Sequence, residues 1–210
     1  MTPTRANGVE HLCWLGEVRA LVDAVDQAVY DTVAGTPTPR LDRQLVGVST
    51  AANYSRLWLV TAAAMVVVGG APGRRAARQG VLAVALTSAV TNLVLKPLAR
   101  RHRPARSDRR PVSDSRRVRR PVSPSFPSGH AASAFAFASA VGRAAPGVRL
   151  PLRVAAATVA YSRVHTGVHY PSDVVIGAAV GELCGRAVSR WATRRAGAPQ
   201  HGGDHDDKRR

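Results

Sequence analysis

Lysine, cysteine and aromatic side chains are scarce in this sequence of 210 residues. Only Lys96 and Lys208 are lysines, and aromatic residues make up 5% of the chain. The two cysteines, Cys13 and Cys184, are far apart in the sequence, which argues against a disulfide framework and against a zinc site. Cys184 lies within an apolar segment, so we expect a buried free thiol there. Residues 1–17 lack the apolar core of a cleavable signal peptide, and none is expected.

Acidic residues are also few. The chain has 13 acidic and 30 basic side chains, which give a formal net charge of +17. Such an excess predicts anionic partners: nucleic acid, phospholipid head groups or phosphorylated substrates. The arginines flank apolar segments and do not line one face with interleaved aromatic residues, which argues against nucleic acid. The edges of membrane helices are the natural place for arginines in this pattern.

Most apolar segments are shorter than the roughly 20 residues that cross a bilayer. Five helical segments are nevertheless expected, at about 57–70, 80–98, 130–141, 150–161 and 174–191, with Pro72 and Gly73 closing the first. Flanking arginines that snorkel to the interface can supply the missing length. Ala, Gly, Ser and Thr dominate these segments, as in closely packed membrane helices. The predicted fold is therefore all-α, a polytopic membrane helical bundle with about five spanning helices; a soluble all-α bundle is the alternative.

Three smaller features complete this outline. Gly177, Gly181 and Gly185 form a smooth stripe on which another helix can pack. A long loop, about 100–127, contains proline and charge in an imperfect repeat, and its arginines between 106 and 120 are expected to attract anionic head groups. An N-terminal amphipathic helix, ended by the segment 35–39, either lies at the membrane interface or packs on the bundle. Its apolar side holds Val18, Leu21, Val22, Val25, Val29 and Val33.

Three segments concentrate groups suited to phosphate chemistry. The first, 96–104, ends the second apolar segment; the second, 127–130, opens the third; the last, 162–173, bridges the fourth and fifth. If successive helices alternate in direction, all three segments lie at the same end of the bundle. The sequence therefore predicts one common site.

Each of these segments has residues with a chemical use at such a site. Lys96, Arg103 and Arg163 offer positive charge to phosphoryl oxygens. Ser128 and Gly129 open a helix, whose free N–H groups suit an anion. His169 is a candidate nucleophile, and Asp173, four residues later, could orient its imidazole. His130 could donate a proton to a departing alkoxide. His165 and His169 could suggest a metal pair, but no acidic ligand has matching helical spacing, so no metal site is expected.

At these residues the sequence resembles the type 2 phosphatidic acid phosphatase superfamily, which also includes bacterial acid phosphatases and vanadium haloperoxidases. The family pattern is a lysine, six residues and Arg-Pro; then Pro-Ser-Gly-His; then Ser-Arg, five residues, His, three residues and Asp. All three parts match here, in order and without a gap. A match of three parts with fixed internal spacing is far more specific than a single short motif.

The resemblance implies a residue-by-residue mechanism without a metal or other cofactor. His169 would attack phosphorus and become a phosphohistidine, with Asp173 holding its other ring nitrogen. His130 would protonate the leaving oxygen and then help water to hydrolyse the intermediate. The phosphate would be bound by Lys96, Arg103, Ser128, Gly129 and Arg163.

We therefore expect a metal-independent phosphatase whose partners are membrane lipids and a lipid phosphate substrate, with no nucleic acid. Candidate substrates are phosphatidic acid, phosphatidylglycerol phosphate and polyprenyl phosphates, diphosphates or phosphoryl sugar phosphates. Two alternatives are a vanadium-dependent haloperoxidase and a non-catalytic lipid-binding membrane protein. The expected domains are the helix and connector of 1–52, a membrane-embedded phosphatase domain of 53–193 with catalytic motifs at 96–173, and a flexible polar tail of 194–210.

The resemblance also implies a multi-pass protein of the cell membrane with its active site on the extracytoplasmic face. A cluster of arginines on the face opposite the site would then be cytoplasmic, as the positive-inside rule favours. This cluster holds Arg74, Arg75, Arg78, Arg143, Arg149, Arg190, Arg194 and Arg195. The rule discriminates weakly, because the loop beside the expected site is equally basic.

Overall fold

The computed structural model describes residues 6–104, 114–119 and 121–196, and within these ranges the chain is helical with no strand. The all-α prediction is confirmed. The main helices are α1 (Ala6–Gly35), α2 (Pro39–Ala51), α3 (Arg56–Val68), α4 (Gly70–Ala89), α5 (Lys96–Ala99), α6 (Gly129–Ala144), α7 (Arg149–His165) and α8 (Pro171–Ala196). Short 3-10 or π-helical segments lie at η1 (Asn53–Ser55), η2 (Val90–Leu95), η3 (Asp114–Arg116) and η4 (Pro146–Val148).

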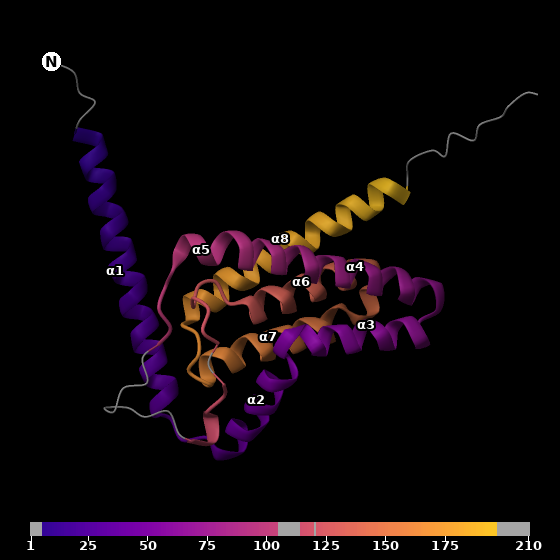
Figure 1. Cartoon of the computed structure of the whole chain (residues 1–210), viewed down its shortest axis with the longest axis horizontal. Coiled ribbons are helices and arrows are strands. Elements are labelled where there is room, and N and C mark those ends of the chain that lie inside the picture. Colours follow the sequence, from indigo (N-terminus) through magenta and orange to yellow (C-terminus); the bar gives the residue numbers. More distant parts are fainter. Residues whose placement is uncertain (1–5, 105–113, 120, 197–210) are drawn as a thin grey trace, which may run out of the picture.

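Helix α6 forms the centre of a bundle and packs against α4, α7 and α8, while α3 packs on α4. These helices run side by side in Figure 1, and α1 lies crosswise at one end of them. Most residues of α6 are buried, and most of the buried ones are alanine or serine. Because such side chains are short, the neighbouring helices approach its backbone closely. Phe137 fills the space beside Trp58, with ring centroids 5.4 Å apart.

The glycine stripe of α8 is in contact with α6. A Cβ atom added at Gly177 would lie 2.5 Å from the carbonyl oxygen of Ser128, and one at Gly185 would lie 2.7 Å from that of Ala136. At Gly181 the added atom would overlap the carbonyl oxygen of Ala132. Glycine is therefore required at these positions because the two backbones touch. The predicted packing stripe is confirmed.

Several expected boundaries were wrong. The chain turns at Gly69 and Gly70, and Pro72 and Gly73 lie in the first turn of α4. Proline is tolerated there because the first N–H groups of a helix have no intrahelical acceptor. Helix α4 therefore begins ten residues earlier than predicted, and α7 extends to His165 and includes Arg163. Cys184 is free as expected, but half-buried instead of buried.

Helix α2 was not predicted as a helix, because its pattern of burial is unusual. Its inward side carries Asp42 and Ser49 together with one apolar residue, Leu45. A stripe of polar residues gives no signal of hydrophobic periodicity. The helix begins at Pro39, where proline suits the first turn, and it packs against α7.

Helix α1 contacts the bundle through polar side chains. Asp26 and Tyr30 are buried against α7 and α8, and the Tyr30 ring packs edge-on against Tyr170 at a centroid distance of 6.1 Å. The predicted apolar side of this helix is largely exposed, at Val18, Leu21, Val22, Val25 and Val29. Two placements were expected for this helix, at the membrane interface or packed on the bundle. The helix packs on the bundle, and it does so through its polar side.

Length and composition identify one described helix, Gly70–Ala99, as able to cross a membrane. The pair Pro39–Ala51 and Asn53–Val68 would form a second span if its two arms, bent by 62°, act together. The expected number of about five spans is thus not confirmed by this criterion. Residues 105–113 and 120, which include most arginines of the expected head-group loop, lie outside the described residues, as does the tail from residue 197.

Substitution of Gly181 by alanine tests the contact between α6 and α8. We expect Gly181→Ala to lower the free energy of unfolding by about 1–3 kcal/mol, because the added methyl group meets a backbone carbonyl that must move. Gly47→Ala on α2 is the control, since no atom of the described residues lies within 4 Å of its added Cβ, and it should stabilise the helix by up to about 1 kcal/mol. Thermal unfolding in detergent measures both, and equal melting temperatures would contradict the packing.

Candidate active site

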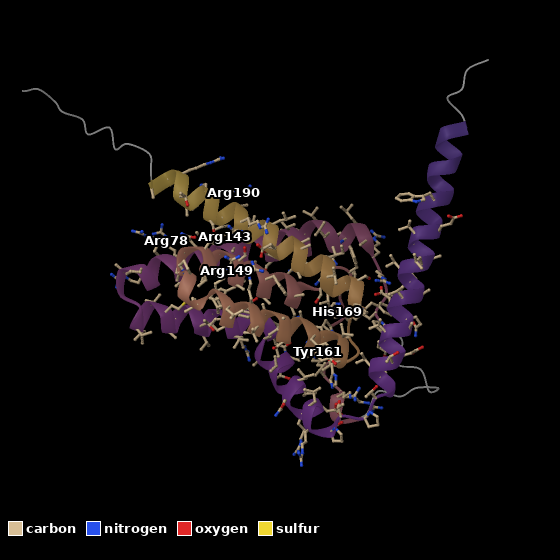
Figure 2. All side chains as sticks on the ribbon, turned by 180° about the vertical axis from the view of Figure 1, so that it is seen from behind. Arg78, Arg143, Arg149, Tyr161, His169 and Arg190 are labelled. Carbon is tan, nitrogen blue, oxygen red and sulfur yellow. The ribbon has the colours of Figure 1, made fainter. Side chains whose placement is uncertain are left out.

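The three motif segments meet at the end of the bundle beside α1. Lys96 opens α5, Ser128 precedes the first turn of α6, Arg163 lies in the last turn of α7, and His169 and Asp173 flank the start of α8. Figure 2 shows His169 at the end opposite four labelled arginines of the far face, Arg78, Arg143, Arg149 and Arg190. The structure thus brings together residues that are up to 77 positions apart, as alternating helices require.

His169 is buried, and its two ring nitrogens have different surroundings. Nη1 of Arg103 lies 3.1 Å from Nε2 of His169. A guanidinium group can only donate, so Nε2 must present a lone pair. Nδ1 lies 3.5 Å from Oδ2 of Asp173 and 3.5 Å from Oγ of Ser125. A carboxylate beside Nδ1 favours a proton on that nitrogen, so the site orients the free lone pair of Nε2 towards the cationic side.

The carboxylate of Asp173 is fully buried and receives several donors. The hydroxyl of Ser125 and the backbone N–H of Tyr170, at 2.9 Å, donate to Oδ2. Nη1 of Arg101 donates to Oδ1 at 3.0 Å. These bonds hold the carboxylate in place beside His169. The contact between the carboxylate and the imidazole ring is itself long, at 3.5 Å.

Arg101 connects this carboxylate to helix α1. Its Nη2 lies 2.7 Å from Oδ1 of Asp23 and 2.8 Å from Oδ2 of Asp26, and its guanidinium stacks 4.5 Å from the centre of the Tyr170 ring. Asp26 in turn accepts the backbone N–H of Ser172 at 2.9 Å. The crosswise position of α1 is therefore fixed by ion pairs that end on Asp173.

Three cationic side chains, Lys96, Arg103 and Arg163, lie around the two histidines His130 and His169. Arg103 is anchored by the carbonyl oxygens of Ser123, at 3.1 Å, and Val168, at 2.7 Å. Nζ of Lys96 donates to Asn92 at 2.9 Å and lies next to Gly129, 3.8 Å from the position of an added Cβ. Arg163 is 1% exposed and donates to the hydroxyl of Ser49, while its Nε has no hydrogen-bond partner among the described residues.

The start of α6 faces these cations. Ser128 is fully buried and its backbone N–H donates to the carbonyl oxygen of Asp173 at 2.9 Å. Its hydroxyl neither caps the helix nor has another partner in the described part of the chain. The first N–H groups of α6 therefore have no side-chain cap, and with the helix dipole they form an anion-binding end. Gly129 keeps this end open beside Lys96.

Four residues of this site were missed by sequence reasoning. Arg101 lies within the first motif segment, 96–104, and Ser125 lies two residues before the second, so their position was the available signal. Asn53, whose Oδ1 lies 3.0 Å from Nε2 of His130, and Ser49 come from the end of α2 and the following turn. No spacing in the sequence connects them to the motifs, because only the fold brings α2 to this end.

A second buried carboxylate, that of Asp42 on α2, is the hydrogen-bond partner of His165. Nε2 of His165 lies 2.8 Å from Oδ1 of Asp42, which also receives Nε of Arg116 at 2.8 Å. Arg116 further donates to the carbonyl oxygens of Val33 and Thr36 at the end of α1. This network fastens the loop after α5 to α1, α2 and α7. His165 has a structural partner, and no described group of three His, Cys, Asp or Glu side chains could hold a metal ion.

The surroundings of His169 lower its affinity for a proton. Burial lowers the pKa of His169 to about 4, and the charges of Arg103 and Arg163 act in the same direction against the opposing effect of Asp173. A group with this pKa is neutral throughout the physiological range. The imidazole therefore keeps the Nε2 lone pair available at neutral pH.

This protonation state can be measured directly. In protein labelled with ¹⁵N-histidine, we expect the His169 ring to carry its proton on Nδ1 and to titrate with a midpoint near pH 4, with His169→Gln assigning the signal. Asp173→Asn should move the midpoint to lower pH, because it removes the charge that favours the imidazolium. A midpoint near 6.5, or a proton on Nε2, would contradict this geometry.

Comparison with known proteins gives two kinds of relative. The curated ones are named decaprenylphosphoryl-5-phosphoribose phosphatase. That of Mycobacterium tuberculosis is 35% identical over 175 residues, which cover 82% of this chain and 89% of the relative. That of Mycolicibacterium smegmatis is 35% identical over 162 residues, with 74% and 80% covered.

Two crystal structures share the fold. LpxE of Aquifex aeolicus has a TM-score of 0.63 at 23% identity and covers 78% of this chain and 94% of its own. The first transmembrane PAP2 type phosphatidylglycerolphosphate phosphatase of Bacillus subtilis has a TM-score of 0.64 at 22% identity, with 83% and 87% covered. The sequence profile of the PAP2 superfamily matches residues 78–196, which contain all three motif segments. This chain is a member of the PAP2 superfamily.

Proposed function

We propose that this protein is a metal-independent lipid phosphatase that works through a phosphohistidine on His169. One observation carries the proposal: Nε2 of His169 presents a lone pair beside Arg103, while Nδ1 faces the carboxylate of Asp173. A nucleophile must be unprotonated on the attacking atom and held in orientation by its other side. The family membership and the phosphatase names of the relatives favour the same chemistry.

In the first half of the reaction, Nε2 of His169 attacks phosphorus from the side opposite the leaving group. The bond between phosphorus and the ester oxygen breaks, and His130 gives a proton to that oxygen, so the alcohol leaves neutral. The nearby Asp173 stabilises the positive charge that develops on the ring of His169. The products of this half are the alcohol, the phosphohistidine and a neutral His130.

In the second half, water attacks the phosphohistidine. Neutral His130 takes a proton from the water, the bond between phosphorus and Nε2 breaks, and inorganic phosphate is released. Both imidazoles then have their starting protonation. His130 thus acts first as acid and then as base, as a single group must in a two-step displacement.

The phosphoryl oxygens bind to Lys96, Arg103 and Arg163 and to the start of α6 at Ser128 and Gly129. Nε of Arg163 and Oγ of Ser128 are buried and have no partner in the described part of the chain, which supports this assignment, because a buried polar group needs an acceptor or donor. Arginine can bind two oxygens at once, and fixed donors stabilise charge that develops in the transition state.

The substrate is a lipid phosphate. Both mycobacterial relatives are named for a polyprenyl-phosphoryl sugar phosphate, which makes this class the first to test. Phosphatidic acid, phosphatidylglycerol phosphate and simple polyprenyl phosphates are the further candidates. A haloperoxidase activity with vanadate is not favoured by these names, and a purely lipid-binding role would leave the oriented pair of His169 and Asp173 without a use.

The protein is a multi-pass membrane protein in this proposal, with its active site on the extracytoplasmic face. Exposed apolar side chains along α3, α4, α7 and α8 support contact with lipid. Arginines at the end opposite His169 support a cytoplasmic position for that end. Residues 53–193 form the phosphatase domain, and 1–52 add α1 and α2 to its active-site end.

Phosphate release tests the activity. Detergent-solubilised protein with EDTA should release phosphate from at least one lipid phosphate, and His169→Ala should lower kcat by roughly 10⁴-fold or more, because the covalent route is lost. Rapid acid-free quenching with ³²P-labelled substrate should trap an alkali-stable phosphoryl group on the wild type and none on His169→Ala. Full activity of His169→Ala, or complete inhibition by EDTA, would contradict the proposal.

Cysteine labelling tests the orientation. In a variant whose two native cysteines are replaced by serine, Tyr54→Cys marks the active-site end and Arg78→Cys the opposite end, since both residues are exposed. We expect a membrane-impermeant maleimide to label position 54 in intact cells and position 78 only after permeabilisation. The reverse pattern would place the site in the cytoplasm.

A further inference from the structure

The turn between α2 and α3 reaches the active site although it lies before the family-matched residues. Oδ1 of Asn53 lies 3.0 Å from Nε2 of His130. One turn earlier in the chain, the buried hydroxyl of Ser49 receives Nη1 of Arg163. The end of α2 thus contacts two residues to which the proposed function gives direct roles, and Asn53 is the one that touches the acid.

The backbone around Asn53 is unusual. The two residues after it, Tyr54 and Ser55, have φ angles of 54° and 58°, which lie in the left-handed region that side chains with a Cβ disfavour. These two residues lie at the start of the arm Asn53–Val68, which is bent by 62° from α2. Strained residues persist where the surrounding structure requires them, and they cluster at functional sites. Here the bend places the amide of Asn53 against His130.

The electrostatic surroundings of His130 are unfavourable for an acid. The charged and titratable groups that act on it are Arg163 of α7, Lys96 of α5, Arg103 and His169. Three of these groups are cations, and each disfavours a second positive charge on the imidazole. A general acid in this position needs a neighbour that stabilises its protonated form, and the amide oxygen of Asn53 is such a neighbour.

We propose that Asn53 is a positioning residue that accepts the Nε2 proton of His130 and so makes Nδ1 the atom that exchanges protons in the reaction. An amide oxygen only accepts hydrogen bonds, so the contact fixes a proton on Nε2. The imidazolium then gives its Nδ1 proton to the leaving oxygen as the phosphorus–oxygen bond breaks. The neutral ring later takes a proton from water at Nδ1, while Nε2 stays bonded to Asn53.

This inference rests on the proposed function, and two substitutions of similar shape test it. Asn53→Leu removes the acceptor, whereas Asn53→Asp strengthens it with a charge. The alkaline limb of the pH profile of kcat reports loss of the imidazolium of His130. It should move to lower pH in Asn53→Leu and to higher pH in Asn53→Asp, while the acid limb set by His169 stays in place in both.

The leaving group provides a second readout. With a lipid or alkyl phosphate, Asn53→Leu should lower kcat at neutral pH by at least about tenfold, because general acid catalysis contributes 10²–10⁴-fold. With p-nitrophenyl phosphate, whose leaving group departs without a proton, the loss should be less than about threefold. Thr50→Val, an exposed position of α2, is the matched control and should behave as wild type with both substrates.

The outcomes separate this inference from the function on which it rests. Wild-type protein that releases no phosphate from any substrate would refute the proposed function. An active wild type with equal losses on both substrates in Asn53→Leu, and unshifted profiles in both variants, would overturn the role of Asn53. If Asn53→Leu does not fold, judged by its thermal unfolding, the direction of the shift in Asn53→Asp decides.

Discussion

The active-site end of this protein depends on the buried carboxylate of Asp173. A buried charge is costly unless donors surround it, and this one receives Ser125, Tyr170 and Arg101 while it faces His169. Each donor comes from a different part of the chain: the loop before α6, the loop before α8 and the segment after α5. The same carboxylate that orients the imidazole therefore holds these segments together, so the geometry of catalysis and local stability have one origin.

Two other buried carboxylates also hold segments of the chain together at the active-site end of the bundle. Asp26 and Asp42 are both 2% exposed, and they pair with Arg101 and Arg116. Through these pairs α1 and α2 are fastened to the loop after α5. Removal of either arginine would leave the buried carboxylate with fewer donors, so these pairs contribute to the attachment of both helices. Carboxylates thus order the frame of the site, and its interior remains cationic.

This cationic interior explains a preference for phosphate. Lys96, Arg103 and Arg163 lie close together, and the partners described for Lys96 and Arg163 are neutral oxygen atoms of Asn92, Ser123 and Ser49. Their mutual repulsion is relieved by an anion with several oxygens. A bound phosphoryl group also offsets the cations that disfavour protonation of His130, so substrate binding itself favours the acid form that the proposed first step requires.

The phosphatase chemistry and the helical fold class could be predicted, because motif spacing and small-residue composition are visible in the sequence without knowledge of the fold. The packing role of the α8 glycines could be predicted for the same reason, because their four-residue spacing lies within one short segment of the sequence. The start of α4 was mispredicted because Pro72 is acceptable in a first helical turn as well as in a loop. Helix α2 and Asn53 could not be predicted, since a helix that buries Asp42 and Ser49 has no apolar periodicity and its partners lie far along the chain. The polar docking side of α1 was hidden by the more obvious valine stripe on its exposed side.

Vanadate imitates the pentacoordinate phosphoryl group, so a structure of the protein with vanadate bound would show directly whether His169 is the nucleophile. We expect vanadium bonded to Nε2 of His169, with its oxygens on Arg103, Arg163 and the first N–H groups of α6, and with Nδ1 of His169 still facing Asp173. Vanadate bound away from His169, or a His169 ring turned so that Nδ1 faces the ligand, would contradict it.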